Sequence, residues 1–260
     1  MGTPGLPKIS IITVTYNAEA VLPTTLQSIA AQTCAPFEYL IIDGGSTDST
    51  LDLIQQHQTL ISFWLSEPDG GLYDAMNKGL RHATGDYVWF INAGDSLHAP
   101  DTLEQLTAFW QTQPTPDVLY GEVMYVTPQG QALGIRSAVT PLRLPEKLAW
   151  RSLQYGMVVS HQGFIVKRSL CPAYDWQQYP LSADIDWVIR CLKKAPIIKH
   201  SHQILANFEQ GGISRQRLKQ SLWDRWRIMT VHYGWLSTFW AHAYIVLRSV
   251  WFLAKKRRWY

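Results

Sequence analysis

The hydrophobic positions in the first hundred residues predict short buried strands that alternate with helices. Apolar, β-rich runs mark four strands, at residues 8–16, 37–42, 61–66 and 87–91. Between them, apolar residues three and four positions apart predict helices over residues 20–32, 49–58 and 73–83. Strands and helices that alternate at this spacing are typical of a mostly parallel sheet with right-handed crossover connections.

The pattern is less regular in the second half of the chain. It predicts helices near residues 101–113, 146–153 and 184–193, a hairpin of residues 118–126 and 131–135, one or two strands within 158–166, and a strand over 197–208. Two further helical stretches, 215–230 and 235–253, close the chain. We therefore expect one α/β domain over residues 1–214 and a helical tail over residues 215–260.

Acidic residues follow three of the predicted strands directly. Asp43 ends the second strand, and Glu67 and Asp69 follow the third. Asp95 closes the Asn-Ala-Gly-Asp stretch after the fourth. Each could be an ordinary turn residue, since Asp, Asn and Gly are common in turns. In open α/β sheets, however, ligands bind beyond the carboxyl ends of the strands, so several carboxylates at this edge predict a binding site.

The charges divide the chain where the hydrophobic pattern does. From Arg215 onward ten Lys or Arg residues face a single acid, Asp224, which gives this segment +9, while residues 1–214 carry −6 and the whole chain +3. The same segment holds six of the twelve tryptophans. Such a tail indicates a separate surface role, at a membrane or at nucleic acid. The acidic character of residues 1–214 argues against nucleic acid.

Cysteine usage and the N-terminal sequence favour a reducing compartment. Cys34, Cys171 and Cys191 are too few and too scattered for a disulfide framework, and they form no C-x-x-C pair that would suggest zinc. No basic and apolar segment typical of a signal peptide precedes the first strand. We therefore expect a cytoplasmic protein.

Five segments in a fixed order carry a resemblance to a known family: Ile9–Asn17, Asp43–Thr50, Glu67–Gly79, Gly85–Val88 and Asn92–Asp95. Together they resemble the family 2 glycosyltransferases of the GT-A fold, a Rossmann-like α/β fold. Within that family the chain looks like the bacterial exopolysaccharide group that includes colanic-acid-type transferases. The resemblance covers about residues 7–214. It implies transfer of a sugar from a nucleotide-diphosphate sugar to an acceptor hydroxyl, with inversion at the anomeric carbon.

The resemblance also implies which residues bind the donor. The implied nucleotide-sugar contacts are Thr13, Thr15, Tyr16, Asn17, Asp43, Asp69, Asn77, Lys78 and Asn92. Asn92–Asp95 occupies the place of an Asp-x-Asp-like motif that holds Mg²⁺ or Mn²⁺ on the diphosphate. Because Asn92 replaces the first acid, Asp95 is the expected metal ligand. Gly44 replaces a second Asp that contacts the base in many relatives.

Some of these residues also have simpler interpretations. Thr13 could be a plain strand residue. Asp74 and Lys78 could form a surface pair four positions apart on a helix, worth about 0.3–0.5 kcal/mol. Asp48 is better explained as a cap of the following helix than as a ligand contact, because Asp favours helix N-termini.

The catalytic base is expected in the second half of the chain. The segment Leu181–Trp187 resembles the acidic motif in which the family carries its base, with Ala183 in place of the usual first Glu and Asp184 at the position of the base. A carboxylate within reach of an alcohol can remove its proton as the new bond forms. Asp186 is expected to be structural. His161 and Gln162 match a family position at the end of a strand, on the acceptor side.

Two loop features refine the expected activity. Residues 211–214 resemble the loop that closes over the donor in relatives. The Gln-x-x-Arg-Trp motif of processive polysaccharide synthases is absent from the sequence, which favours a single addition per encounter.

The tail is expected to attach the enzyme to the inner face of the cell membrane. Its Lys, Arg, Trp and Tyr residues are typical of an interfacial amphipathic anchor on anionic lipids, where a lipid-linked glycan acceptor would be found. Arg248 interrupts the apolar stretch, so a membrane-spanning or re-entrant segment is the second interpretation and an ordinary packing helix pair the third.

Two other functions were weighed against glycosyl transfer. A sugar-nucleotidyltransferase should carry a Gly-rich, basic phosphate loop after the first strand, but residues 15–19 read Thr-Tyr-Asn-Ala-Glu. A non-catalytic protein that binds through its basic tail would not need the carboxylates at the strand ends.

Overall fold

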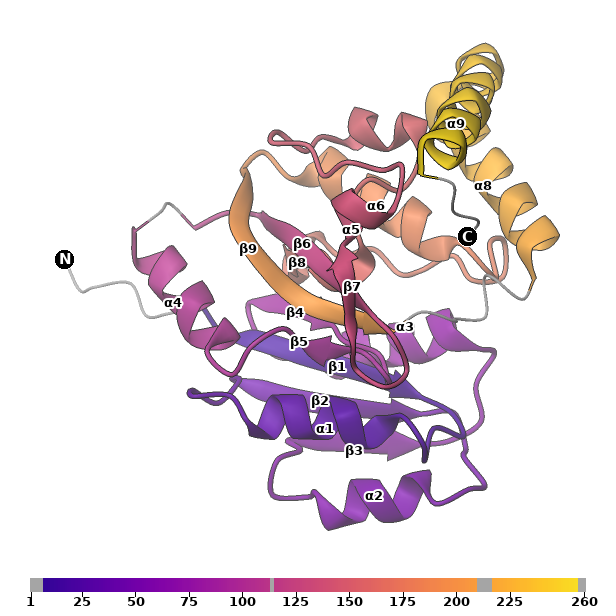
Figure 1. The fold of residues 1–260 in the computed structure, drawn as a ribbon. Coiled ribbons are helices and arrows are strands. Elements are labelled where there is room, and N and C mark those ends of the chain that lie inside the picture. Colours follow the sequence, from indigo (N-terminus) through magenta and orange to yellow (C-terminus); the bar gives the residue numbers. More distant parts are fainter. Residues whose placement is uncertain (1–6, 113–114, 210–216, 257–260) are drawn as a thin grey trace.

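The computed structural model describes residues 7–112, 115–209 and 217–256, and its first half follows the predicted alternation (Figure 1). Strands β1 (Ile9–Thr15), β2 (Glu38–Asp43), β3 (Phe63–Ser66) and β4 (Tyr87–Phe90) are parallel, in the order β3-β2-β1-β4. The connections are α1 (Leu22–Ala30), α2 (Thr50–Gln56) and α3 (Leu72–His82). The predicted strands, helices and parallel pairing of this half are confirmed.

Helices cover both faces of these parallel strands. α3 packs with Ile12 and Leu40 on one face, whereas α1 and α2 pack with Ile11 and Ile41 on the other. Gly79 lets α3 approach closely, because a Cβ at this position would lie 2.6 Å from Cγ2 of Ile12. With both faces covered, every residue of β1 is buried, which explains why the strand sequences are apolar runs and not strict alternations.

The second half extends the same sheet with strands of mixed direction. β8 (Phe164–Lys167) pairs antiparallel with β4 and with β6 (Val118–Val126). β9 (Ile198–Glu209) is parallel to β6 and antiparallel to β5 (Ser96–Leu97). β7 (Ala132–Ile135) returns from β6 as the predicted hairpin. The parallel pattern therefore holds for four strands and gives way to mixed pairing beyond β4.

Short helical segments connect these strands: α4 (Thr102–Thr112), α5 (Arg136–Val139), η1 (Trp150–Tyr155), η2 (His161–Gly163), η3 (Arg168–Leu170) and α6 (Ala183–Lys194). Two predictions need correction here. Only the end of the segment 158–166 is a strand, since His161–Gly163 forms a 3₁₀ turn. The helix predicted near residues 146–153 begins at Trp150 and is also 3₁₀.

The tail forms a helical hairpin that packs on the domain. α8 (Leu218–Tyr233) and α9 (Trp235–Lys256) are joined at Gly234, and the rings of Trp226 and His242 lie 4.8 Å apart between them. Arg248 does not interrupt α9, and its guanidinium donates to the carbonyl of Tyr155 at 2.8 Å. Among the helices of residues 7–112, 115–209 and 217–256, none is both long and apolar enough to cross a bilayer.

α8 is attached to the start of α6 by buried polar contacts. Asp224 accepts the backbone N–H of Leu181 at 3.0 Å, and the hydroxyls of Ser182 and Ser221 lie 3.0 Å apart. Ser221 and Asp224 are 1% and 2% exposed. Ser182 and Leu181 lie two and three residues before the predicted base, Asp184. α8 therefore contributes to the local structure around this base.

Candidate active site

Asp43 shapes the loop after β2 from a fully buried position. Its Oδ2 accepts the backbone N–H groups of Gly45 (3.0 Å) and Ser46 (2.9 Å) and the hydroxyl of Ser66 (2.7 Å), and its Oδ1 accepts the hydroxyl of Ser46. These four bonds match the acceptor capacity of a carboxylate. In this conformation Asp43 holds the loop in place mainly through Oδ2, whereas Oδ1 accepts a single hydrogen bond.

A second carboxylate lies above Gly44 although residue 44 has no side chain. Oδ2 of Asp69 is 2.7 Å from the point that a Cβ of Gly44 would occupy. Oδ1 of Asp69 accepts the backbone N–H of Gly71 at 2.8 Å, and partial burial raises the pKa of Asp69. The loop between β3 and α3 thus places the carboxylate of Asp69 beside Gly44, the position at which many relatives carry an Asp.

Two threonines of β1 differ in their surroundings. Thr13 is fully buried, where its hydroxyl donates to the carbonyl of Ile91 at 2.6 Å and accepts from the hydroxyl of Tyr39 at 3.0 Å. Thr13 is therefore an internal strand residue, as its simpler interpretation has it. The buried Oγ1 of Thr15 has no hydrogen-bond partner among the described residues, so this atom is available to a ligand.

Tyr16 and Asn17 begin the loop after β1. Tyr16 is 64% exposed, so its ring is available to a planar ligand. Asn17 adopts a left-handed conformation with φ of 45°, and its Oδ1 accepts the backbone N–H of Thr47 at 2.9 Å. Asn17 connects the loops after β1 and β2. Asp48 accepts the backbone N–H of Thr50, the first residue of α2, as its capping interpretation predicts.

Lys78 points toward the loop that carries Asp69. Its buried ammonium pairs with Glu67 at 2.8 Å and donates to the carbonyl of Pro68 at 3.0 Å. Asp74 instead accepts the backbone N–H of Gly70 at 3.0 Å. The surface pair between Asp74 and Lys78, which the helical spacing allowed, is not formed.

The buried carboxylate of Asp95 accepts hydrogen bonds from η2 and β9. This carboxylate is 5% exposed; its Oδ2 accepts from the side-chain amide of Gln162 at 2.7 Å and its Oδ1 from the backbone N–H of Glu209 at 3.4 Å. Oε2 of Glu209 lies 3.6 Å from the Cβ position of Gly94. Oδ1 of Asn92 is buried without a hydrogen-bond partner in the described part of the chain.

This arrangement fits a hard divalent cation. Burial is the main cause that raises the pKa of Asp95 to about 7, and the charge of Glu209 acts in the same direction. The carboxylates of Asp95 and Glu209 and the unpaired amide oxygen of Asn92 are the oxygen ligands that Mg²⁺ and Mn²⁺ prefer, and these ions bind few protein groups beside substrate phosphates.

Asp184 lies in the first turn of α6 and remains partly exposed. Its Oδ1 accepts the hydroxyl of Tyr73 at 2.9 Å. Asp186, two residues on, is buried and bonds to His232 and Arg190, each at 2.7 Å. The two acids therefore differ: Asp186 is buried in a network of hydrogen bonds, whereas Asp184 is partly exposed and accepts one hydrogen bond from a buried side chain.

The turn η2 lies between the two halves of the site. Gln162 contacts Asp95. His161 interacts electrostatically with Asp184 and is 2.7 Å from the hydroxyl of Tyr174 through Nε2. Burial lowers the pKa of His161 to about 4, so its ring is neutral near pH 7. His161 and Gln162, both predicted for the acceptor side, thus interact with different acids: Gln162 with Asp95 and His161 with Asp184.

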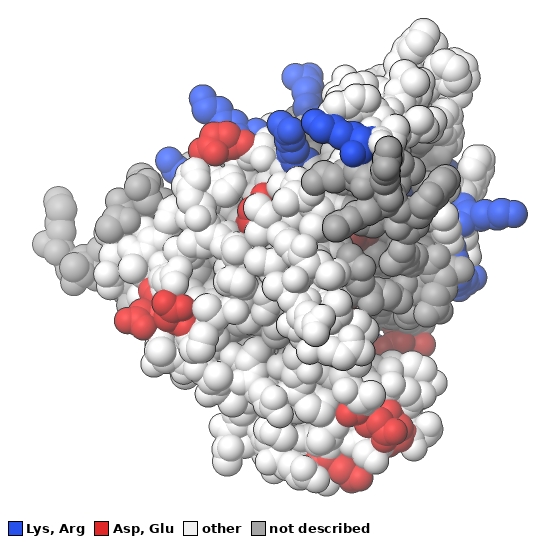
Figure 2. All heavy atoms as spheres, viewed as in Figure 1, with Lys and Arg blue, Asp and Glu red and all other residues white. Residues whose placement is uncertain are grey.

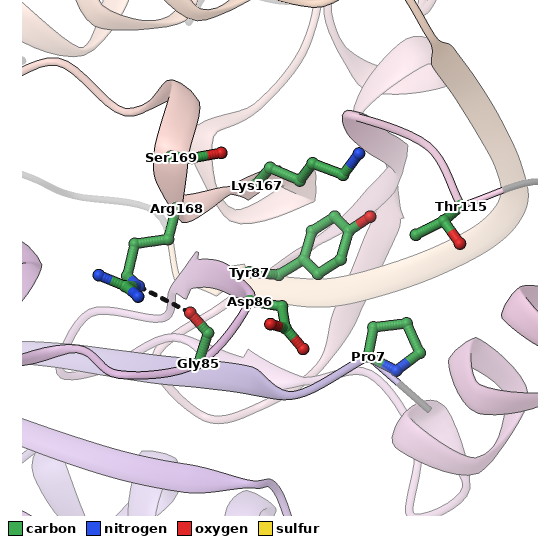
Figure 3. Close-up of a pocket in the computed structure, with 8 residues that line it drawn as sticks. All are labelled: Pro7, Gly85, Asp86, Tyr87, Thr115, Lys167, Arg168 and Ser169. Atoms are coloured by element: carbon green, nitrogen blue, oxygen red, sulfur yellow. Dashed lines mark hydrogen bonds between the residues drawn. The ribbon is translucent and has the colours of Figure 1, made fainter. Parts of the chain in front are cut away.

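A pocket of about 370 Å³ elsewhere is not part of this site. It lies where β4 begins and is lined by Pro7, Gly85, Asp86, Tyr87, Thr115, Lys167, Arg168 and Ser169 (Figure 3). Figure 3 shows the guanidinium of Arg168 on the carbonyl of Gly85, at 2.8 Å. The candidate site is at the opposite end of β4, where Asn92 and Asp95 follow the strand.

The family of the chain follows from comparison with known proteins. A model of the family described as "Glycosyl transferase family 2" matches residues 10–172, more than half of the chain. The chain belongs to glycosyl transferase family 2. A curated relative from Mycobacterium bovis, "PGL/p-HBAD biosynthesis glycosyltransferase", is 35% identical over 216 residues, which cover 80% of this chain and 79% of the relative.

Solved structures confirm the GT-A fold. Staphylococcus aureus TarS 1–349 in complex with UDP-GlcNAc superposes with a TM-score of 0.66 at 19% identity, over 93% of this chain and 72% of that one. A longer TarS chain is covered to 43%. The mannosyltransferase PcManGT from Pyrobaculum calidifontis, in complex with GDP-Man and Mn²⁺, has a TM-score of 0.57 at 18% identity, over 98% of this chain and 80% of that one.

Two residues of the site were not predicted from the sequence. Glu209 ends a strand that is remote in sequence from Asp95, and only the sheet order places the two together. Tyr73 looked like a buried helix residue, because its apolar spacing gives no sign of the carboxylate it meets 111 positions later. Residues 211–214, predicted to close over the donor, lie outside the described residues.

Proposed function

We propose that this glycosyltransferase is an inverting, metal-dependent enzyme that transfers a sugar from a nucleotide-diphosphate sugar to a hydroxyl of a lipid-linked glycan in polysaccharide biosynthesis. The observation that supports the proposal is the turn η2, where the side chain of Gln162 donates to Asp95 and the neighbouring His161 interacts electrostatically with Asp184. The groups proposed for the leaving-group side and for the nucleophile side are therefore both linked to this turn.

On the donor side, Asp95, Asn92 and Glu209 would hold Mg²⁺ or Mn²⁺. The ion would neutralise the diphosphate that leaves. The unpaired Oγ1 of Thr15 and the exposed ring of Tyr16 are available to the nucleoside. Asp69 supplies the carboxylate above Gly44, and Lys78 fixes the loop that carries Asp69 and adds positive charge to this edge.

On the acceptor side, Asp184 acts as the general base. An alcohol is a weak nucleophile until a base within hydrogen-bond reach removes its proton. Asp184 takes the proton of the acceptor hydroxyl as its oxygen bonds to C1 of the sugar, and the bond from C1 to the diphosphate oxygen breaks on the opposite face. The chain just before Asp184 is held by α8, through the hydrogen bonds of Leu181 with Asp224 and of Ser182 with Ser221.

The tail supports attachment to the cytoplasmic face of a membrane. Most of the exposed large apolar side chains of the described residues lie on α8 and α9, among them Trp223, Trp235, Leu236, Trp240, Leu247 and Trp251, each at least 59% exposed. Figure 2 shows most of the Lys and Arg of this face in the upper half of the view, toward these helices, whereas Asp and Glu are spread from the upper left to the lower end. Apolar and basic groups together favour an anionic lipid surface.

Binding and turnover together test the proposal. UDP, GDP and dTDP are titrated into the purified chain with and without Mn²⁺, and the D184N variant is assayed beside the wild type. We expect one nucleotide to bind in a Mn²⁺-dependent manner, and D184N to retain this affinity while it loses transfer. Full activity of D184N, or nucleotide binding that ignores Mn²⁺, contradicts the proposal.

A further inference from the structure

The hydroxyl of Tyr73 donates a hydrogen bond to the proposed base, Asp184. We propose that Tyr73 is a positioning residue for Asp184, whose hydroxyl fixes Oδ1 and leaves Oδ2 free for the acceptor hydroxyl. This inference rests on the proposed function, because it assigns Asp184 as the base. A base must be held at hydrogen-bond distance from the proton that it removes, and a third group commonly orients it.

The hydrogen bond joins a buried donor to a partly exposed acceptor. Tyr73 is 5% exposed, and its hydroxyl lies 2.9 Å from Oδ1 of Asp184. Burial, followed by the charge of Asp184, raises the pKa of Tyr73 well above its ordinary value. The phenol therefore stays protonated and donates a hydrogen bond to the carboxylate of Asp184. Such a hydrogen bond favours the ionised form of a carboxylate, which is the form that can act as a base.

The ring of Tyr73 stacks on a neighbour that is itself held by other residues. It stacks on Tyr174 with ring centroids 5.6 Å apart, and Tyr174 stacks on Trp187 of α6 at 4.9 Å. Asn77, one turn along α3, binds the backbone of Tyr174 through both ends of its amide, at 2.7 and 2.9 Å. A stacked ring with a fixed neighbour has little freedom, so its hydroxyl offers Asp184 a rigid partner.

The contact also joins the donor side to the acceptor side. Tyr73 belongs to α3, which carries Lys78 and follows the loop of Asp69, whereas Asp184 begins α6. The base is thus positioned by an element of the donor half. His161 on η2, Tyr174 before α6 and Arg225 on α8 are the other titratable or charged groups of neighbouring elements that interact with this pair, and Asp186 is the further acid on α6.

The test is the isosteric variant Y73F, with Y174F as its matched control. Y73F removes the hydroxyl on Asp184 and keeps the stacked ring, whereas Y174F removes a neighbouring buried hydroxyl that contacts His161. We expect Y73F to lower kcat by about 10- to 100-fold, the loss expected for one hydrogen bond to a charged group. The KM of the donor and the affinity for the nucleotide should stay within twofold of wild type.

The pH profile separates positioning from packing. With Y73F the acidic limb of the kcat profile should move to higher pH, because the ionised carboxylate has lost a donor. Y174F should leave this limb in place. Wild-type kcat with an unmoved limb in Y73F overturns the inference, as does a parallel loss of thermal stability and nucleotide affinity. If D184N is inactive in the same assay, such a result rejects only the role of Tyr73; an active D184N rejects the base itself.

Discussion

The carboxylate of Asp224 on α8 accepts the backbone N–H of Leu181 at 3.0 Å, three residues before Asp184. The tail, which differs in charge and composition from the rest of the chain, therefore supports the turn that presents the proposed base. Removal of the tail would also remove the contact of Asp224 with this turn, so the surface role of the tail is better tested by substitutions on its exposed face than by truncation.

The contact of Asp224 predicts a loss of stability and turnover together. D224A removes the buried hydrogen bond between the carboxylate of Asp224 and the N–H of Leu181, which should cost about 1–3 kcal/mol of unfolding free energy. It should also reduce kcat, since the start of α6 is no longer fixed. Urea unfolding and initial rates measure both effects. D224N, which retains an acceptor oxygen, is the matched control; equal losses in D224A and D224N would contradict the assignment.

The oxygen atoms that we propose as metal ligands predict how substitutions change the affinity for Mn²⁺. E209Q should weaken Mn²⁺ binding by about 10- to 100-fold, the range for groups that support a metal site. N92D adds the acid that the motif lacks and should tighten binding. Electron paramagnetic resonance of free Mn²⁺ measures both without donor or turnover. E104Q, on α4 away from the site, serves as control, and an unchanged affinity in E209Q would exclude Glu209 as a ligand.

The raised pKa of Asp95 predicts that the metal-free protein loses stability as pH rises. In the folded chain this carboxyl holds its proton up to pH about 7, whereas in the unfolded chain it ionises near its ordinary value of 3.8. The stabilising effect of the bound proton is thus complete below 3.8 and is lost as pH rises through 7. D95N cannot ionise, so its Tm in EDTA should exceed that of wild type at pH 8 by more than at pH 5. A Tm difference that does not change with pH would disprove this.

The exposed tryptophans of α9 predict binding to anionic lipid. Replacement of Trp235, Trp240 and Trp251 by Ala, at 59%, 70% and 61% exposure, should abolish co-sedimentation with vesicles that contain phosphatidylglycerol. Binding by wild type should weaken with salt, because basic residues contribute to it. The rate on a water-soluble acceptor should not change. The control F37A, at an exposed apolar residue outside the tail, should still bind; vesicle binding by the triple variant would rule out this surface.

The sequence predicted those parts of the fold that local pattern determines. β1 to β4 and α1 to α3 have strong periodicities and clear breaks, and each was predicted to within about three residues. The two-residue strand β5 and the 3₁₀ turn η2 were missed, because segments this short have no period to detect.

In the candidate site too, local sequence pattern predicted some features, whereas others depend on contacts between distant parts of the chain. The residues at the strand ends, Asp43, Asp69 and Asp95, were predicted because parallel strands share one carboxyl edge. What each side chain does there was not predictable. Asp43 binds its own loop, Asn77 binds the backbone of Tyr174, and Glu209 reaches the site through the order of β9 in the sheet. These contacts depend on long-range packing that no local pattern contains.

The turn η2 carries His161 and Gln162 at adjacent positions of the chain. Successive side chains of a 3₁₀ helix point about 120° apart, so His161 and Gln162 face different halves of the site from adjacent positions. The side chain that donates to Asp95 and the side chain that interacts with Asp184 are thus joined by a single peptide unit. An insertion at this turn would move the two apart and, under the proposed function, stop the reaction although every side chain of the proposed site remains in the sequence.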